Sequence, residues 1–414
     1  MFDEHYYVNA ARKIMSMPVS GGIYADSPAG IDPNGSHPGL VKLILATSLK
    51  ILGDRAFAWR LPSVIFGTAA LLALYWLARS AGARPWVALG ATSLAAVDTL
   101  FFLHSRIGTL DIFAVTFMIL SVSFYLRGRP LLSGLMLGLG ASAKLVALFV
   151  LLIIAFMELF KVLVEARSGT FEPKSKVREA AKLFLLGGVA VATLLIFTNF
   201  YDRAFYPSSN PVKHTLLMLR NVSTGGLDPS ITALSRQEAE KRAGEDDSII
   251  FRTDGQRVRK APRSRPLEWL LNRHAINYFR LDSPRGEVTS WTLLGQKSPY
   301  LMAFTARMNP AIIFLAIPAL FFSAFASWRR RNAGLFLPVA WFAGTFGPFL
   351  VADLAGVPKL GLIYYMVIVL PGIYLAIATL FSGRKVAPIF VPALALSAIT
   401  CFWIYYPFRT WAGV

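Results

Sequence analysis

Two neighbouring carboxylates, Asp3 and Glu4, stand near the start of a 414-residue chain that is otherwise rich in long apolar segments. A carboxylate beside a lipid bilayer is energetically unfavourable and usually serves a function. Such a group can accept the proton of an attacking hydroxyl group. The alternative is that the pair is only surface charge on a frayed terminus, and the pair on its own leaves both interpretations open.

Basic residues in two later turns favour the chemical interpretation. Arg106 and Asp111 flank a predicted turn, and Asp98 lies shortly before it. Lys144 lies in the next turn expected on the same side of the membrane. A guanidinium group can bind phosphate oxygens in pairs, and an ammonium group adds a point charge. Together they predict a site for a lipid phosphate, where a carboxylate deprotonates a hydroxyl group that attacks an activated carbon.

Each basic residue also has a simpler explanation. Arg106 and Lys144 could extend along helix ends toward the membrane interface, and Asp111 could cap the following helix. These explanations treat the residues one at a time. The functional hypothesis instead requires all of them to converge with Asp3.

The elements that position these residues are predicted to be membrane-spanning helices. Hydrophobic residues make up 55% of the chain and charged residues 16%, which excludes an ordinary soluble enzyme. Apolar runs long enough to cross about 30 Å of hydrocarbon occur at residues 61–80, 85–103, 110–126, 181–200, 310–326, 335–351, 360–381 and 386–405. The fold class is therefore predicted to be all-α and polytopic.

A further apolar stretch, residues 131–160, is interrupted by Lys144. It is too long for one perpendicular helix at about 1.5 Å per residue and short for two. We interpret it as two short spans that meet at Lys144 on the outer side, which gives about ten transmembrane helices. A single tilted helix or a re-entrant pair is the alternative.

Lys and Arg in the short loops predict the orientation, because cytoplasmic loops retain positive charge. Basic residues occur in alternate turns, and those turns are assigned to the cytoplasm. The predicted organisation is a first extracytoplasmic loop at 1–60, an N-terminal transmembrane core at 61–200, a long extracytoplasmic loop at 201–309 and C-terminal transmembrane helices at 310–414. Residues 40–52 are expected to form an amphipathic helix on the membrane surface. Since the first span then enters from outside, we expect a first helix to be missing ahead of Asp3.

The formal charge of +19 does not indicate nucleic-acid binding, because much of the basic excess follows the membrane topology. The basic segment 252–265 is expected to be a solvated part of the long outer loop, with anionic lipid headgroups as the alternative contact. The single cysteine, Cys401, lies in a predicted span. No disulfide framework is therefore expected.

Several ordered segments resemble the protein O-mannosyltransferase family, whose members have the GT-C membrane fold. They are FDEHYY, HPGLVKL, AWRLPSVIFG, the block from Asp98 to SRIGTLD, and SAKLVALF, followed later by RPLEW and MNP. The resemblance covers most of the chain and is strongest over residues 1–160. It implies a polyprenyl- or dolichyl-phosphate-linked mannose donor, an outward-facing active site, and transfer to Ser or Thr hydroxyl groups with inversion.

The resemblance also implies roles for the candidate residues. Asp3 would be the catalytic base and Glu4 would orient the acceptor. Arg106 and Lys144 would bind the donor phosphate. His37 would shape the same first outer loop.

Asp98 and Asp111 are expected to support this site. No cofactor and no metal are expected for the family, although Asp3, Glu4 and His37 have the chemistry of metal ligands. The expected partners are the lipid-linked donor, a secreted or membrane protein acceptor and the bilayer, with a dimer as a further possibility and no nucleic acid.

Three departures from the family pattern bear on the biology. The first helix of the family is not seen, HPG stands where a second proline is usual, and the loop at 201–309 is too short for the sugar-binding trefoil domain of eukaryotic members. A prokaryotic cell membrane with an outward-facing site is therefore expected, or the endoplasmic reticulum membrane in a eukaryote. Two alternatives stay open: a GT-C enzyme acting on a glycolipid or cell-wall glycan, and a transporter of lipid-linked sugars, which would place charges near span midpoints.

Overall fold

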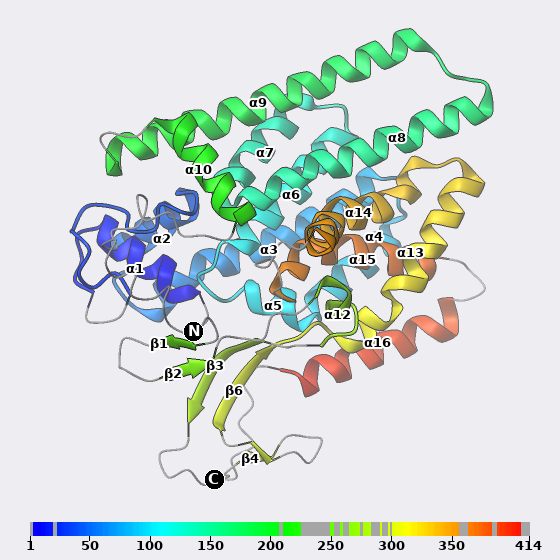
Figure 1. Ribbon diagram of the computed structural model, residues 1–414. Helices are drawn as coiled ribbons and strands as arrows, with labels where there is room; N and C mark the ends of the chain where they lie inside the picture. Colours follow the sequence, from blue (N-terminus) through cyan, green and yellow to red (C-terminus); the bar gives the residue numbers. More distant parts are fainter. Residues whose placement is uncertain are drawn as a thin grey trace.

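The computed structural model describes residues 3–19, 23–206, 210–224, 249–251, 257–259, 265–273, 276–282, 290–291, 297–298, 300–355, 363–382 and 387–406. Most of the basic segment 252–265 lies outside these residues. The body of the molecule is a bundle of helices (Figure 1). Its membrane-type helices are α3 (Ala56–Ser80), α4 (Pro85–Ala96), α5 (Thr99–His104), α6 (Asp111–Leu126), α7 (Pro130–Ala143), α8 (Val150–Ser168), α9 (Pro173–Phe205), α13 (Pro310–Arg330), α14 (Ala333–Leu354), α15 (Met366–Leu380) and α16 (Ala387–Ile404).

Within the described part of the chain, six helical segments are long and apolar enough to cross a membrane. They are Ala56–Ser80, Leu145–Ser168, Lys176–Phe205, Pro310–Arg330, Ala333–Leu354 and Ile363–Leu380. Shorter apolar helices occur at Pro85–Ala96, Asp111–Leu126, Pro130–Ala143 and Phe390–Ile404. Each predicted span therefore has a helical counterpart. The chain is an integral membrane protein with several apolar spans, and the crossing of all ten segments stays a prediction.

The apolar stretch around Lys144 is two helical segments, as expected. Helix α7 ends at Ala143, and the 3₁₀ turn η1 (Leu145–Phe149) leads directly into α8. Lys144 itself is extended, with φ −158° and ψ 130°. The break places its side chain at the end of both segments.

Turns that the charge pattern assigns to the cytoplasm contact one another. Arg127, after α6, donates to the Ser80 hydroxyl at the end of α3 over 2.9 Å. Arg331, between α13 and α14, donates to the Ser168 hydroxyl at the end of α8, also over 2.9 Å. A Cβ at Gly334 of α14 would lie 2.0 Å from the Ala81 carbonyl oxygen after α3, so these turns lie at a common end of the bundle.

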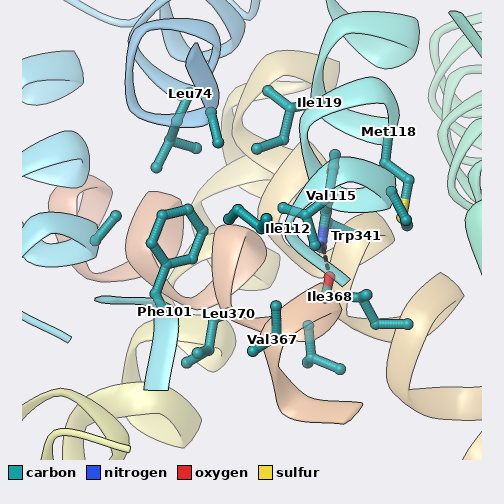
Figure 2. Packing of buried hydrophobic residues seen from close by; sticks show 14 of the residues in the cluster. Leu74, Phe101, Ile112, Val115, Met118, Ile119, Trp341, Val367, Ile368 and Leu370 are labelled. Carbon is teal, nitrogen blue, oxygen red and sulfur yellow. Dashed lines mark hydrogen bonds between the residues drawn. The ribbon is translucent and has the colours of Figure 1, made fainter. Parts of the chain in front are cut away.

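The apolar core joins helices that are far apart in sequence. In Figure 2, residues of α3, α5, α6 and α15 lie around Trp341 of α14, whose side chain is fully buried. Its indole N–H donates to the Ile368 carbonyl of α15 over 2.8 Å, so the polar group in this apolar environment is paired. A Cβ added at Gly372 would lie 3.0 Å from Trp341. Close approach of α14 and α15 thus depends on a glycine.

Helices α7 and α9 also pack through glycines. A Cβ at Gly134 would lie 2.5 Å from the Leu186 carbonyl oxygen, and one at Gly138 would lie 2.4 Å from the Thr193 Cβ. Small residues four positions apart let two helix backbones approach closely in a membrane. The GLMLG segment of α7 is such a surface.

We expect Gly138→Leu to destabilise the folded protein by about 1–3 kcal/mol, because the added side chain overpacks the contact with α9. The measurement is the thermal unfolding midpoint of the purified protein in detergent. Gly187→Leu is the matched control, since nothing lies within 4 Å of a Cβ at that position of α9. Equal midpoints for the two variants would contradict the packing described.

Elements outside the bundle frame the end that carries the candidate residues. Helix α1 (Glu4–Ile14) was not anticipated, whereas α2 (Leu40–Leu52) has the predicted bounds. Its placement on the membrane surface stays a prediction, and its Lys42 is completely buried. The long loop contributes α10 (Pro211–Thr224), α12 (Pro266–Trp269) and short strands, namely β1 (Ile249–Phe251), β2 (Arg257–Arg259), β3 (Ile276–Asp282), β4 (Ser290–Trp291), β5 (Lys297–Ser298) and β6 (Tyr300–Ala306).

These strands form three two-stranded antiparallel ribbons, β1–β2, β3–β6 and β4–β5. The β3–β6 ribbon extends from the helical body near α5 (Figure 1). The all-α expectation therefore describes the bundle but not the long loop, where extended pairs occur. Their short strands carry no long apolar run that the sequence could have shown.

Candidate active site

Asp3 occupies the N-cap position of α1 with φ +29°. Few non-glycine residues adopt a positive φ, and those that do are frequent at functional sites. Aspartate is a good helix cap, yet the Asp3 side chain forms no capping hydrogen bond with α1. The residue is partly buried, and its carboxylate lies close enough to Lys144 and Asp111 to interact with their charges.

Burial raises the pKa of Asp3 to about 6. The nearby ammonium group of Lys144 lowers it, and the carboxylate of Asp111 raises it further. Desolvation therefore outweighs the attraction of the lysine. A carboxylate with a pKa near 6 is ionised at neutral pH and more basic than an ordinary aspartate, which suits a general base.

Lys144 and Asp111 form a buried ion pair, with 2.6 Å between Nζ and Oδ1. The break between α7 and η1 presents the lysine, and the first turn of α6 presents the aspartate. The ammonium also lies 5.0 Å from the ring centroid of Tyr364 and 5.2 Å from that of Tyr365. A buried cation with two aromatic neighbours and an acidic partner is held in a fixed position.

Histidine and tyrosine residues extend this cluster toward the long loop. His104, at the end of α5, has its Nδ1 3.8 Å from Asp111 Oδ2. Its Nε2 forms a 2.7 Å hydrogen bond with the hydroxyl of Tyr278 on β3. The long loop thus reaches the candidate site, although sequence patterns did not indicate His104 or Tyr278 as site residues.

His37 lies in the first outer loop and faces the same region. Its ring meets that of Tyr7 edge-on, with 5.8 Å between centroids. Burial, followed by the positive charges of Lys144 and Lys42, lowers the pKa of His37 to about 3. The imidazole is therefore neutral at physiological pH and offers hydrogen bonding rather than charge.

Glu4 points in a different direction from Asp3. Its Oε1 accepts hydrogen bonds from Arg60 Nε over 2.9 Å and from the Gly108 backbone N–H over 3.0 Å. Its Oε2 accepts from Arg60 Nη2 over 2.7 Å. Both oxygens join α1 to α3, and Oε1 also joins it to the turn before α6. These contacts give Glu4 a structural role. Its role in orienting the acceptor stays a prediction.

Arg106 is not brought into the Asp3–Asp111–Lys144 cluster. Its guanidinium carbon lies 4.0 Å from the centroid of the Phe102 ring, and the side chain is exposed. Among the described residues it forms no ion pair. Its binding of the donor phosphate stays a prediction.

Asp98 supports the architecture from a distance. Its Oδ1 accepts from the backbone N–H groups of Leu100 and Phe101 at the start of α5, over 3.0 and 3.1 Å. Its Oδ2 accepts from the Asn309 backbone N–H over 3.0 Å. The aspartate therefore joins α5, which carries His104, to the beginning of α13.

The site thus combines a half-buried base with a fixed cation. Asp3 can accept a proton, and Lys144 can stabilise negative charge that develops nearby. In the described part of the chain, no group of three His, Cys, Asp or Glu residues is arranged to hold a metal ion. The geometry suits transfer of a group from an anionic leaving group to a hydroxyl.

Comparisons with known proteins agree with this chemistry. A model of the dolichyl-phosphate-mannose-protein mannosyltransferase family matches residues 36–196. The polyprenol-phosphate-mannose–protein mannosyltransferase of Corynebacterium glutamicum is 24% identical over 396 residues, which cover 85% of this chain and 72% of that protein.

Solved structures show the same fold at low identity. The Saccharomyces cerevisiae protein O-mannosyltransferase Pmt1-Pmt2 complex bound to the sugar donor contains a chain with TM-score 0.63 and 13% identity, covering 98% of this chain and 86% of that one. Archaeal oligosaccharyltransferase AglB from Archaeoglobus fulgidus has TM-score 0.51 and 17% identity, with 99% and 52% covered. ArnT from Cupriavidus metallidurans bound to undecaprenyl phosphate has TM-score 0.51 and 15% identity, with 95% and 58% covered. The fold is therefore of the GT-C type.

Proposed function

We propose that this chain is a member of the dolichyl-phosphate-mannose-protein mannosyltransferase family, whose model matches residues 36–196, and that it transfers mannose from a polyprenyl-phosphate carrier to Ser or Thr hydroxyl groups of proteins. The single observation that best supports the chemistry is the cluster of Asp3, Asp111 and Lys144. It combines a base with a cation that is suited to bind a phosphate, at one end of the bundle.

In the proposed step, Asp3 accepts the proton of the acceptor hydroxyl group. At the same time, the oxygen of that hydroxyl group attacks C1 of the mannosyl group. The bond between C1 and the phosphate oxygen breaks, and its electron pair leaves with the lipid phosphate. Lys144 stabilises the charge on that leaving group. Attack from the face opposite the phosphate inverts the configuration at C1.

Asp111 and His104 hold this machinery in place. The ion pair with Asp111 fixes the ammonium of Lys144, and the contact between His104 and Tyr278 ties the same corner to the long loop. A positioned cation stabilises a developing charge better than a mobile one, because no reorganisation is needed during the reaction. The site is proposed to face the extracytoplasmic side of a bacterial cell membrane, as the charge pattern predicts.

The test is mannosyl transfer by membranes that contain the full chain. Radiolabelled polyprenyl-phosphate mannose is supplied with a Ser/Thr-rich peptide, and the matched control peptide carries Ala at every Ser and Thr. Label in the first peptide alone supports the proposal. Label in lipid or glycan instead would assign the acceptor to the glycolipid or cell-wall class, and label in neither would overturn the transferase proposal.

The pH dependence of transfer should follow the ionisation of Asp3. Since its pKa is raised to about 6, the base is ionised above that value and protonated below it. On the acidic side, we expect kcat/KM to fall about tenfold per pH unit below pH 6 and to reach its full value near neutral pH. A profile that stays flat down to the ordinary aspartate range near pH 4 would contradict the assignment of Asp3 as the base.

A further inference from the structure

A second buried polar cluster lies beside the proposed site and takes no part in the chemistry described above. It joins the turn at residues 32–37 to α2, α9 and α10. Lys42 and Asp32 form its central ion pair, and neither side chain is exposed. Tyr201 donates to the same Asp32 carboxylate over 2.8 Å, and Tyr206 donates to the Asp32 carbonyl over 2.6 Å.

The turn is held from the α2 side by Lys42. Its ammonium donates to the carbonyl of Asn34 over 2.6 Å and to the carbonyl of His37 over 2.9 Å. His37 in turn contacts Tyr7 of α1 and interacts electrostatically with Lys144. The position of this turn therefore determines where His37 stands relative to the proposed site.

From the α10 side the turn is held by His214. Its Nε2 lies 2.8 Å from the Gly35 carbonyl oxygen, and its Nδ1 lies 2.8 Å from Asp202 Oδ1 at the end of α9. The ring also meets the Tyr206 ring edge-on, with 5.3 Å between centroids. We call the two hydrogen bonds of His214 the His214 bridge.

The partners of the bridge determine its protonation. A carbonyl oxygen can only accept, so Nε2 must carry a hydrogen. Nδ1 then faces the Asp202 carboxylate, which can only accept when it is ionised. In a neutral imidazole, the lone pair of the unprotonated Nδ1 would face a lone pair of the carboxylate oxygen, which is unfavourable. The geometry therefore matches an imidazolium that donates from both nitrogens.

In the described part of the chain, the charged and titratable groups that face His214 come from α9, the residue that follows it, and α2. Asp202 is on α9, Tyr206 directly follows that helix, and Lys42 is on α2. Burial and the charge of Lys42 disfavour the imidazolium, but the hydrogen bonds to Asp202 and Gly35 outweigh them and raise the pKa of His214 above its ordinary value.

We infer that His214 is a positioning residue, whose protonated bridge holds the turn at residues 32–37 beside the site and releases it when the imidazole loses its proton. This inference rests on the proposed function for its consequence on transfer. Because the charged form is the one favoured by the fold, the bridge is intact at and below the ordinary histidine value near pH 6.5. It is lost as the pH rises through the raised value, and transfer falls with it on the alkaline side.

The release can be measured without any sugar donor. In a Cys401→Ser background, which removes the single native cysteine, Ser36→Cys reports access to the turn through its rate of labelling by a membrane-impermeant maleimide. Asp26→Cys, at an exposed position of the same outer loop, provides the reference rate that corrects for thiol ionisation. The ratio of the two rates is followed from pH 6 to pH 9.

Two further variants separate the proton from the packing. Asp202→Asn supplies an amide N–H to Nδ1, so a neutral imidazole can keep both hydrogen bonds. His214→Leu removes the bridge at every pH. We expect the labelling ratio to rise about tenfold with pH when His214 and Asp202 are native, the change that corresponds to losing one charge-assisted hydrogen bond.

With Asp202→Asn the ratio should stay low at every pH, and with His214→Leu it should stay high. A flat ratio in the native background, or a His214→Leu ratio equal to the native value at pH 6, would overturn the inference. If His214→Leu does not accumulate in membranes, the comparison of native Asp202 with Asp202→Asn decides alone. Because labelling uses no donor, a failure of mannosyl transfer would overturn the proposed function and leave this result intact.

Transfer supplies the second readout. The alkaline fall of kcat should disappear in Asp202→Asn, while the acidic limb set by Asp3 stays in place. A purely structural role for the bridge would lower activity equally at all pH values. An alkaline fall that is unchanged in Asp202→Asn would contradict the positioning role.

Discussion

Asp3→Asn is expected to lower mannosyl transfer by about 10²- to 10⁴-fold, the range that removal of a general base produces. An amide cannot accept the proton of the acceptor hydroxyl, although it keeps the size of the carboxylate. The N-cap position tolerates asparagine as well as aspartate, so the fold should be preserved. The measurement is single-turnover transfer from radiolabelled donor to the Ser/Thr-rich peptide.

Asp26→Asn is the matched control, because it neutralises an exposed carboxylate of the same outer loop. Its transfer rate should equal that of the native chain. Unfolding midpoints in detergent would verify that both variants are folded. Transfer by Asp3→Asn at the native rate would remove Asp3 from the base role and direct attention to Asp111.

Lys144→Met should affect both activity and stability. Loss of the cation removes the charge that stabilises the leaving phosphate, and a fall in kcat of about 10²- to 10³-fold is expected from the loss of one such group. The variant also leaves the Asp111 carboxylate buried without its partner. Breaking a buried pair in this way costs about 3–5 kcal/mol of folding free energy.

The two effects of Lys144 can be separated by a second substitution. Lys144→Met combined with Asp111→Asn leaves no unpaired charge in the former pair, so most of the lost stability should return while transfer stays low. Lys161→Met is the matched control, since that lysine pairs with Glu158 in a more exposed position, where ion pairs contribute about 0–1 kcal/mol. Recovery of transfer in the double variant would show that Lys144 serves only the fold.

The interruption at Lys144 illustrates how much the sequence could predict. The length of an apolar stretch can be compared with the thickness of the bilayer. Residues 131–160 are longer than one span requires, so the lysine in their middle predicted two segments that meet there. Helices α7 and α8 with η1 between them confirm the two segments and the break at Lys144, while their crossing of the membrane stays a prediction. The same reasoning located the helical segments of the other predicted spans, because the constraint acts along the chain.

Neighbouring residues show where such reasoning stops. Asp3 and Glu4 are adjacent, yet α1 begins between them, and successive residues of a helix point about 100° apart. Asp3 consequently turns toward the cluster of Lys144, whereas Glu4 turns toward Arg60. Arg106 was expected beside them because of its place in the turn, but it packs on Phe102, four residues earlier on the adjacent helix turn.

By itself, then, the sequence determined the class of protein, the positions of the apolar helices and the kinds of side chain that could form the candidate site. These properties follow from hydropathy and charge, which are read locally along the chain. Only the tertiary structure decided which side chains meet. Tyr278 reaches His104 across 174 residues, and His214 reaches Gly35 across 179. No periodicity connects positions so distant, because packing of the whole bundle decides which side chains become neighbours.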